Sequence, residues 1–312
     1  MSDPDETRLL VELSRDHYLA GRSKVEIAQD RGLSRFQVAR LLERARALGV
    51  VRIEVAVPPH LDLPRARRLA ARLGAAAVVV AESADDPAVT RENVARELAG
   101  VIGSRVVRGG CLGLAWSRTV EAAVGHLPAL PSCDVVQLSG ALPVAGGDHG
   151  YGIHYRFAAM PGVRTWPLLA PLVVGDATTA EALRGEPEIA AALRRAGDLD
   201  VAVVEVCPWS AQGADLYGRV PAADRDAAAA AGAVAECAGR LLDPDGRPVA
   251  AAFDARVLAA QVDQLVRTPE VIAAGQGAAA APGLRAAVAG GLARILVMDD
   301  SAAAGLERLL EA

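Results

Sequence analysis

The chain has 312 residues, of which 52% are hydrophobic, and its formal net charge is −5. This length allows about two domains, and the apolar content can fill a large core. The overall acidity excludes a protein that coats nucleic acid non-specifically, so any DNA contact must be local to one module. We find no apolar signal-peptide core and no strongly apolar run long enough for a membrane span, so a cytoplasmic protein is expected.

Cysteine and lysine usage excludes some chemistry. Cys111, Cys133, Cys207 and Cys237 form no C-x-x-C pair and each lies in an apolar run, which predicts buried free thiols in a reducing compartment. Lys24 is the only lysine, so Schiff-base chemistry is excluded from the larger part of the chain. The common nucleotide-binding, hydrolase and zinc-protease motifs are absent. We therefore expect no metal, no cofactor and no catalytic residue.

Residues 23–51 are predicted to form two short helices joined by a tight turn. Ile27 and Ala28 point inward from the first helix, and Gly32 fits the corner because glycine adopts positive φ at little steric cost. Ser34 can cap the second helix through its side-chain oxygen. The apolar positions of the second helix share one face: Val38, Leu41, Leu42 and Ala45. This order of features is typical of a helix-turn-helix.

The polar face of the second helix is basic. From Ser34 to Arg52 the chain carries five arginines and one acid, an imbalance that a hairpin buried in a core would not need. A recognition helix places its first residues on base edges in the major groove, and phosphates attract its other arginines. We predict that Gln37 and Arg40 read bases of operator DNA and that Arg35 and Arg44 hold phosphates.

The flanking segments complete the predicted domain organisation. Residues 6–20 should form a third helix behind the other two, and the alternation over residues 51–57 predicts a wing strand. We expect a winged helix-turn-helix domain at 1–57, a linker with a connecting helix at 58–74, and an effector-binding domain at 75–312.

From residue 75 short apolar strands alternate with helices. Strands are expected at 77–81, 111–115, 134–138, 164–169, 200–206, 270–274 and 294–298. Helices are expected at 61–73, 88–107, 117–126, 151–160 and 179–196, and after each of the last two strands. A hairpin turn is expected around Asp245 and Gly246. This alternation predicts an α/β, Rossmann-like domain with a parallel sheet covered on both faces. Ligands of such sheets lie beyond the carboxyl ends of the strands.

The best candidate binding segment is GCLGLAWSRT at residues 110–119. A strand there enters a turn before a helix, and free backbone N–H groups of Ser117, Arg118 and Thr119 could hold a phosphate or a sugar hydroxyl. Ser117 could instead merely cap the helix. Ser139 and Gly140, after the next strand, could form the neighbouring wall.

Other polar residues leave alternatives open. Glu236 lies among small residues and could accept a hydrogen bond from a sugar hydroxyl, or be held by the backbone or by Arg240. His149 and His154 are close in sequence, but no third ligand at useful spacing supports a metal site. After the last strand, Asp300 or Ser301 is the expected helix cap.

In combination these segments resemble the SorC family of bacterial sugar-responsive transcriptional regulators. GLAWSRT resembles the family pattern G-[ILV]-[SA]-W-G-x-T, and GAVAE resembles G-A-V-G-[DE], with Ser117 and Ala235 at glycine positions. The resemblance implies a C-terminal domain similar to sugar-phosphate isomerases, a tetramer built as a dimer of dimers, and a sugar, polyol or sugar-phosphate effector. The residues predicted to contact the effector are Gly113, Trp116, Ser117, Arg118, Thr119, Ser139, Gly140, Glu236 and Gln276.

Two departures from the family pattern affect the expected pocket. The family often has a lysine that holds the effector's phosphate, and Ala280 stands at that position here. The usual G-[IV]-G turn is also missing after the strand that ends at Glu205, Val206 and Cys207. A less charged effector, such as an unphosphorylated polyol, is therefore one hypothesis. The rival hypothesis is an isomerase-like or deaminase-like enzyme fused to a DNA-binding module, with Glu236, Asp299 and the two histidines as its only candidate acid–base groups.

Overall fold

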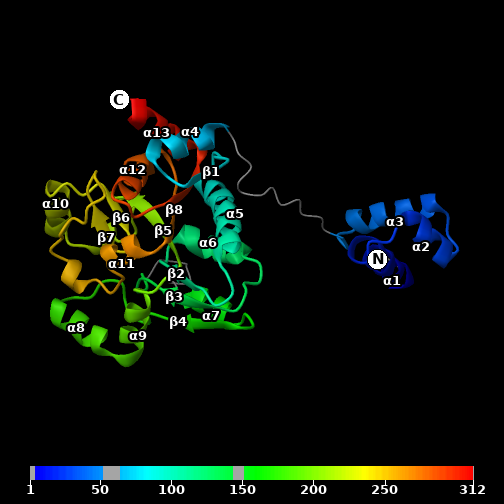
Figure 1. Cartoon of the computed structure of the whole chain (residues 1–312), viewed down its shortest axis with the longest axis horizontal. Coiled ribbons are helices and arrows are strands. Elements are labelled where there is room, and N and C mark those ends of the chain that lie inside the picture. Colours follow the sequence, from blue (N-terminus) through cyan, green and yellow to red (C-terminus); the bar gives the residue numbers. More distant parts are fainter. Residues whose placement is uncertain (1–3, 52–63, 143–150, 312) are drawn as a thin grey trace. The chain divides into compact units, whose positions relative to one another are not determined.

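The structure is a computed structural model that describes residues 4–51, 64–142 and 151–311. The chain divides into two compact units, residues 1–57 and 58–312. The smaller unit contains helices α1 to α3, and every strand that the structure describes lies in the larger one (Figure 1). The elements of the smaller unit are α1 (Pro4–Ser14), a π-helical turn (Arg15–Leu19), α2 (Lys24–Arg31) and α3 (Arg35–Ala47).

The smaller unit is a helix-turn-helix, as its sequence predicts. Its core is formed by residues from all three helices: Leu13, Ile27, Ala28, Val38 and Leu42. Gly32 ends α2 in the left-handed region, with φ of 64°, and lets the chain turn into α3. The wing strand predicted at 51–57 falls outside the described residues, which stop at Val51.

Helix α4 (Pro64–Leu73) lies in the segment predicted to hold the connecting helix, and it packs on the larger unit. Leu69 is 2% exposed and belongs to the core beneath the sheet. The Arg65 guanidinium contacts both carboxylate oxygens of Glu307 at 2.8 and 2.9 Å and also pairs with Asp300. These contacts hold α4 against the last helix of the chain, so it is part of the larger unit.

The larger unit is built on a parallel sheet with strand order β1-β9-β8-β5-β2-β3-β4. The strands are β1 (Ala77–Ala81), β2 (Cys111–Leu114), β3 (Cys133–Gln137), β4 (Val163–Trp166), β5 (Val201–Pro208), β8 (Glu270–Gly275) and β9 (Ile295–Asp299). A short antiparallel hairpin, β6 (Ala235–Cys237) and β7 (Arg240–Leu242), pairs with the end of β5.

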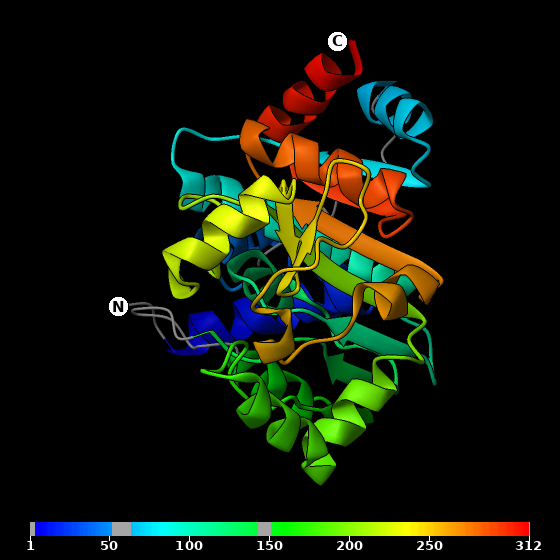
Figure 2. The ribbon, with the colours of Figure 1, turned by 90° about the vertical axis from the view of Figure 1, so that its left-hand side faces the viewer.

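Helices cover both faces of this sheet (Figure 2). The helices are α5 (Pro87–Arg105), α6 (Arg118–His126), α7 (Tyr151–Ala158), α8 (Ala177–Gly185), α9 (Pro187–Arg195), α10 (Ala222–Ala230), α11 (Val262–Arg267), α12 (Ala281–Ala289) and α13 (Asp300–Glu311). Successive strand residues face opposite sides, so Val79 packs in the core that contains α5 and α6, while Val78 packs in the core that contains α12 and α13. Burial on both faces explains why the strands read as continuous apolar runs.

Two features of the larger unit differ from the sequence-based prediction. The single helix expected at 179–196 is two helices, because Pro187 begins α9 and the preceding Glu186 is extended, with ψ of 133°. The hairpin β6–β7 was not predicted. Its turn carries Ala238 at φ 50° and Gly239 at φ 82°. The turn expected near Gly246 is present, and its φ of 77° suits glycine.

Candidate functional site

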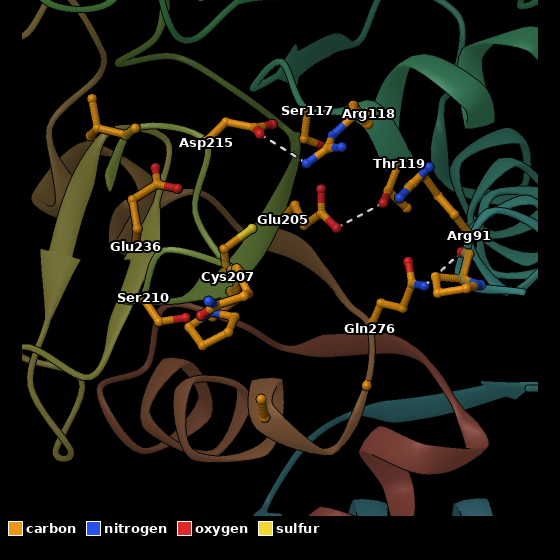
Figure 3. Close-up of a pocket in the computed structure, with 18 of the residues that line it drawn as sticks. Arg91, Ser117, Arg118, Thr119, Glu205, Cys207, Ser210, Asp215, Glu236 and Gln276 are labelled. Atoms are coloured by element: carbon orange, nitrogen blue, oxygen red, sulfur yellow. Dashed lines mark hydrogen bonds and ion pairs between the residues drawn. The ribbon is translucent and has the colours of Figure 1, made fainter. Parts of the chain in front are cut away.

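A pocket of about 430 Å³ lies beyond the carboxyl ends of the parallel strands. Its wall is formed by residues that follow β1, β2, β3, β8 and β9, by the end of β5, and by the β6–β7 hairpin. This is the edge at which ligands of parallel sheets bind, and the volume suits a small organic molecule. Figure 3 shows Arg91 and Gln276 at one end of the pocket, Asp215 and Glu236 at the other, and Glu205 between them.

The turn between β2 and α6 forms the middle of the pocket wall. Ser117 caps α6, and its Oγ accepts a hydrogen bond from the Val120 N–H at 3.0 Å. Thr119 Oγ1 donates to Glu205 Oε1 at 2.7 Å, and Arg118 Nη2 pairs with Asp215 Oδ1 at 2.8 Å. The capping alternative for Ser117 is therefore observed, and it leaves the hydroxyl proton of Ser117 able to donate to a ligand.

Most of the predicted effector-binding residues meet at this pocket. Its lining includes Trp116, Ser117, Arg118, Thr119, Ser139, Glu236 and Gln276. Ser139 Oγ accepts a hydrogen bond from the Trp116 N–H at 3.2 Å, which joins the loops after β2 and β3. Gln276 Nε2 donates to the Pro87 carbonyl oxygen at 2.8 Å.

Gly113 and Gly140 are not brought to the pocket wall. A Cβ atom on Gly113 would lie 2.6 Å from a Leu199 methyl, so this glycine lets β2 pack closely against its neighbours. A Cβ atom on Gly140 would lie 2.6 Å from the Ala170 carbonyl oxygen. Both glycines therefore have a packing role in the structure, and neither of the two predicted effector contacts lines this pocket.

Glu236 is a half-buried carboxylate on β6 whose side chain accepts a hydrogen bond from the Gly239 N–H. Removal from solvent raises the pKa of Glu236 to about 7, and the nearby Glu205 and Asp215 carboxylates act in the same direction. The backbone partner considered from the sequence is thus found, whereas Arg240 instead pairs with Asp254. Glu236 keeps an oxygen without a described protein partner on the pocket wall.

Replacing Glu236 with glutamine is expected to stabilise the unliganded protein by about 1–3 kcal/mol at pH 8 and by less at pH 5. The folded-state pKa is raised from 4.5 to about 7, so the native protein retains a proton that the unfolded chain has lost across this interval. The free energy of unfolding of the wild type should therefore fall as pH rises from about 5 to 7, and the variant should not show this fall. Urea unfolding between pH 5 and 8 measures this, with Glu181→Gln, at a side chain 82% exposed, as the control. Parallel profiles for wild type and Glu236→Gln would contradict the expectation.

Asp299 organises the loops at one end of the pocket. It is 2% exposed, and its Oδ1 accepts hydrogen bonds from the N–H groups of Gly277 at 2.7 Å and Ala302 at 3.3 Å. Its Oδ2 accepts from Ser83 Oγ at 2.8 Å and from the Ser301 N–H at 3.3 Å. Asp299, rather than Asp300 or Ser301 as predicted, thus caps α13, because it ends β9 directly before the helix. One buried carboxylate joins the loops that follow β1 and β8 to the first turn of α13.

Three charged pocket residues were not singled out from the sequence. Glu205 could have been found from the sequence, because an acidic residue near the end of an otherwise apolar strand indicates a side chain at the ligand-binding edge of the sheet. Asp215 lies in the segment after β5, where nothing in the sequence indicated a contact with Arg118. Arg91 lies on α5 and reads as a surface residue, yet it lines the pocket and makes no side-chain hydrogen bond or ion pair with any described residue.

Of the acid–base groups considered from the sequence, Glu236 and Asp299 line the pocket and His154 does not. His154 lines a separate small cavity with Phe157 and Trp166, and His149 lies outside the described residues. Both oxygens of Asp299 are occupied by loop hydrogen bonds. Within the described part of the chain, no cluster of three or more His, Cys, Asp or Glu side chains is arranged to hold a metal ion.

The second candidate site is the exposed face of α3. Ser34 and Gln37 form a reciprocal cap, in which Ser34 Oγ accepts from the Gln37 N–H at 3.2 Å and Gln37 Oε1 accepts from the Ser34 N–H at 2.7 Å. Arg35, Arg40 and Arg44 are all exposed. The predicted capping role of Ser34 is confirmed. The Gln37 carbonyl is engaged, which leaves only its amide N–H₂ for a base.

Several arginines of the smaller unit are paired and others are not. On α1, α2 and the turn between them, Arg8, Arg22 and Arg31 are each paired with acidic side chains. On α3, Arg35 and Arg40 make no ion pair or side-chain hydrogen bond with described residues. Arg35 and Arg40 are therefore available to DNA phosphates and bases on the helix that is predicted to meet them.

A helix-turn-helix whose second helix exposes several arginines, in one chain with an α/β unit that carries a ligand-sized pocket, defines the class of ligand-responsive transcriptional regulators. The family model described as "Putative sugar-binding domain" matches residues 59–307. The chain belongs to this family, and the resemblance to SorC-type regulators seen in its sequence is confirmed.

Similar proteins cover both units. The chain is 27% identical over 308 residues to the transcriptional regulator LsrR of Klebsiella pneumoniae subsp. pneumoniae, covering 96% of this chain and 92% of LsrR. It is 24% identical over 319 residues to the erythritol catabolism regulatory protein EryD of Brucella abortus, covering 98% of each chain. The full-length sorbitol operon regulator SorC of Klebsiella pneumoniae has the same fold, with a TM-score of 0.84, 22% identity, and coverage of 99% of this chain and 100% of SorC.

None of the helices in the described residues is long and apolar enough to cross a membrane.

Proposed function

We propose that this protein is a cytoplasmic transcriptional regulator that binds operator DNA through α3 and binds a small polyhydroxylated effector in the pocket at the strand ends. The observation that carries the proposal is the combination, in one chain, of a helix-turn-helix that exposes Arg35 and Arg40 and a pocket of about 430 Å³ lined by charged and hydroxyl side chains. The erythritol catabolism regulatory protein is similar along nearly the whole chain, and the sorbitol operon regulator shares its fold over 99% of the chain, which supports a sugar or polyol as the effector.

On the DNA side, α3 would lie in the major groove. Arg40, one turn into the helix, would donate to guanine, and Arg35 and Arg44 would hold phosphates. Ser34 would act indirectly, by fixing the start of the helix. Gln37 would contribute less than expected from sequence, because a bidentate contact with adenine needs the carbonyl that caps the helix here.

On the effector side, the pocket offers several hydrogen-bond acceptors. Glu205 and Glu236 would accept hydrogen bonds from sugar hydroxyls, while Ser117 and Ser139 would exchange hydrogen bonds with them. The described pocket wall carries four carboxylates and two guanidiniums: Glu205, Asp215, Glu236, Asp299, Arg91 and Arg118. Alanine occupies the position of the family's lysine, and Ala280 is only 1% exposed. This charge balance favours an uncharged polyol or sugar over its phosphate.

The choice between the two effector classes rests on Arg91, the pocket guanidinium without a described partner. Isothermal titration distinguishes an uncharged effector from a phosphorylated one. A polyol or sugar and its phosphate are each titrated into the wild type and into Arg91→Gln. An uncharged effector should bind wild type more tightly than its phosphate does and should tolerate the substitution. A phosphate that binds far more tightly than the parent, and loses that advantage in Arg91→Gln, would show a phosphorylated effector.

Effector binding would change DNA affinity by shifting the arrangement of subunits. Helix-turn-helix regulators commonly bind two-fold operators as dimers, and we propose a homo-oligomer built as a dimer of dimers. The test is a gel shift of the purified protein on its own promoter fragment, run with a panel of sugars, polyols and their phosphates. Light scattering gives the oligomeric state. Failure to retard that fragment at low salt, with and without every compound, would overturn the proposed function.

A further inference from the structure

The exposed surface of α3 carries one aromatic side chain. Phe36 is 84% exposed, far more than the other large apolar side chains of the same unit: Val11 at 40%, Tyr18 at 37%, Val25 at 48% and Leu48 at 50%. Exposing a phenylalanine of this size leaves a large apolar area in water. A partner surface that covers Phe36 would remove this apolar area from water, which favours binding.

The neighbours of Phe36 indicate the kind of partner. Arg35 and Gln37 flank it in sequence, and Arg40 lies one turn later on the same side of the helix. All three are exposed, and neither arginine has a described acid partner. A protein interface would pair these charges or surround the ring with other apolar side chains, and α3 provides neither around Phe36. A basic surface with a single apolar group fits nucleic acid.

DNA offers one matching apolar group. In the major groove, thymine presents its C5 methyl, and phenylalanine is one of the side chains that contacts it. Phe36 is the second residue of α3, in the part of a recognition helix that reaches base edges. Resting on the proposed operator binding, we propose that Phe36 is a specificity-determining residue that reads a thymine methyl in each half-site.

The helix geometry places this thymine relative to the guanine expected for Arg40. Four residues along a helix span about 6 Å, which corresponds to roughly two base-pair steps. Each half-site should therefore contain a thymine within about one to three base pairs of the guanine that Arg40 reads. The thymine is recognised by contact with its methyl group, and a hydrogen bond is not required.

Replacing thymine with deoxyuracil removes only that methyl and leaves the base pair intact. The operator is first recovered from random duplex DNA by selection with the full-length protein. Each thymine is then replaced in turn and binding is measured by fluorescence anisotropy. We expect one position per half-site at which deoxyuracil weakens wild-type binding by about fourfold, as burial of one methyl group implies. With Phe36→Ala the thymine and deoxyuracil operators should bind equally.

Val25→Ala is the matched control, because it shortens an exposed apolar side chain on α2 and should leave the deoxyuracil effect unchanged. Phe36 is a surface residue, so Phe36→Ala should unfold at the wild-type temperature. A flat deoxyuracil scan with wild type, or an effect that persists in Phe36→Ala, would overturn the assignment while leaving operator binding intact. Selection that recovers no operator at all would remove the proposed function as well.

Discussion

Replacing Asp299 with alanine is expected to lower the free energy of unfolding by about 3 kcal/mol or more and to abolish effector binding. The carboxylate is buried and accepts four hydrogen bonds, two from the loops after β1 and β8 and two from the first turn of α13. Its loss leaves the buried N–H group of Ala302 and the half-buried N–H group of Gly277 without their acceptor, and each buried group left unpaired costs about 1–3 kcal/mol. The loops after β1 and β8 would then lose the residue that joins them to α13 at the pocket.

Urea unfolding and isothermal titration with the effector measure the two consequences of Asp299→Ala. Asp300→Ala is the matched control, because Asp300 is the next residue, is 59% exposed and pairs with Arg65 at the surface. Loss of such a pair costs about 1 kcal/mol or less, and effector binding should persist. Asp299→Asn keeps one acceptor oxygen and should give intermediate stability. Wild-type stability in Asp299→Ala would show that the loops hold their positions without the carboxylate.

Much of the fold could be predicted because its signals are local. The apolar run at 77–81 is β1, and the apolar positions of α3 fall on the buried face as their spacing indicates. The break before Pro187 was also present in the sequence, since the residue before proline avoids helical geometry. The hairpin β6–β7 could not be predicted, because three-residue strands are too short to show alternation and its turn places Ala238 at positive φ.

The site was predictable where it follows a strand and unpredictable where it depends on packing. Ser117 and Ser139 follow neighbouring strands, so the parallel sheet brings them to one edge. Arg118 and Asp215 are 97 residues apart, and no sequence pattern indicates that they pair. Arg91 looks like any polar residue of a surface helix, and only the packing of α5 beside the strand ends places it in the pocket.

Replacing Arg40 with alanine is expected to weaken operator binding by about 1–3 kcal/mol, or roughly 5- to 150-fold, without a change in thermal stability. Arg40 is exposed on α3 and has no described partner, so its removal leaves no buried group unsatisfied. The loss should be specific. Wild type should discriminate strongly at one guanine of each half-site, and the variant should bind operators changed at that position as well as it binds the original.

Two arginine controls separate base reading from simple loss of charge. Arg35→Ala removes a predicted phosphate contact from the same helix, so it should weaken binding to all DNA sequences alike. The slope of log affinity against log salt concentration should become shallower by about one, as loss of one phosphate contact implies. Arg8→Ala removes an equal charge from α1, where Arg8 is 81% exposed and pairs with Glu12, and it should change affinity little. If Arg40→Ala instead resembles Arg35→Ala, with uniform weakening and a shallower salt slope, Arg40 holds a phosphate and the guanine must be read by another residue of α3. Operator affinity within twofold of wild type would remove Arg40 from the reading face, because a guanidinium that contacts a base or a phosphate in the groove cannot be lost without cost.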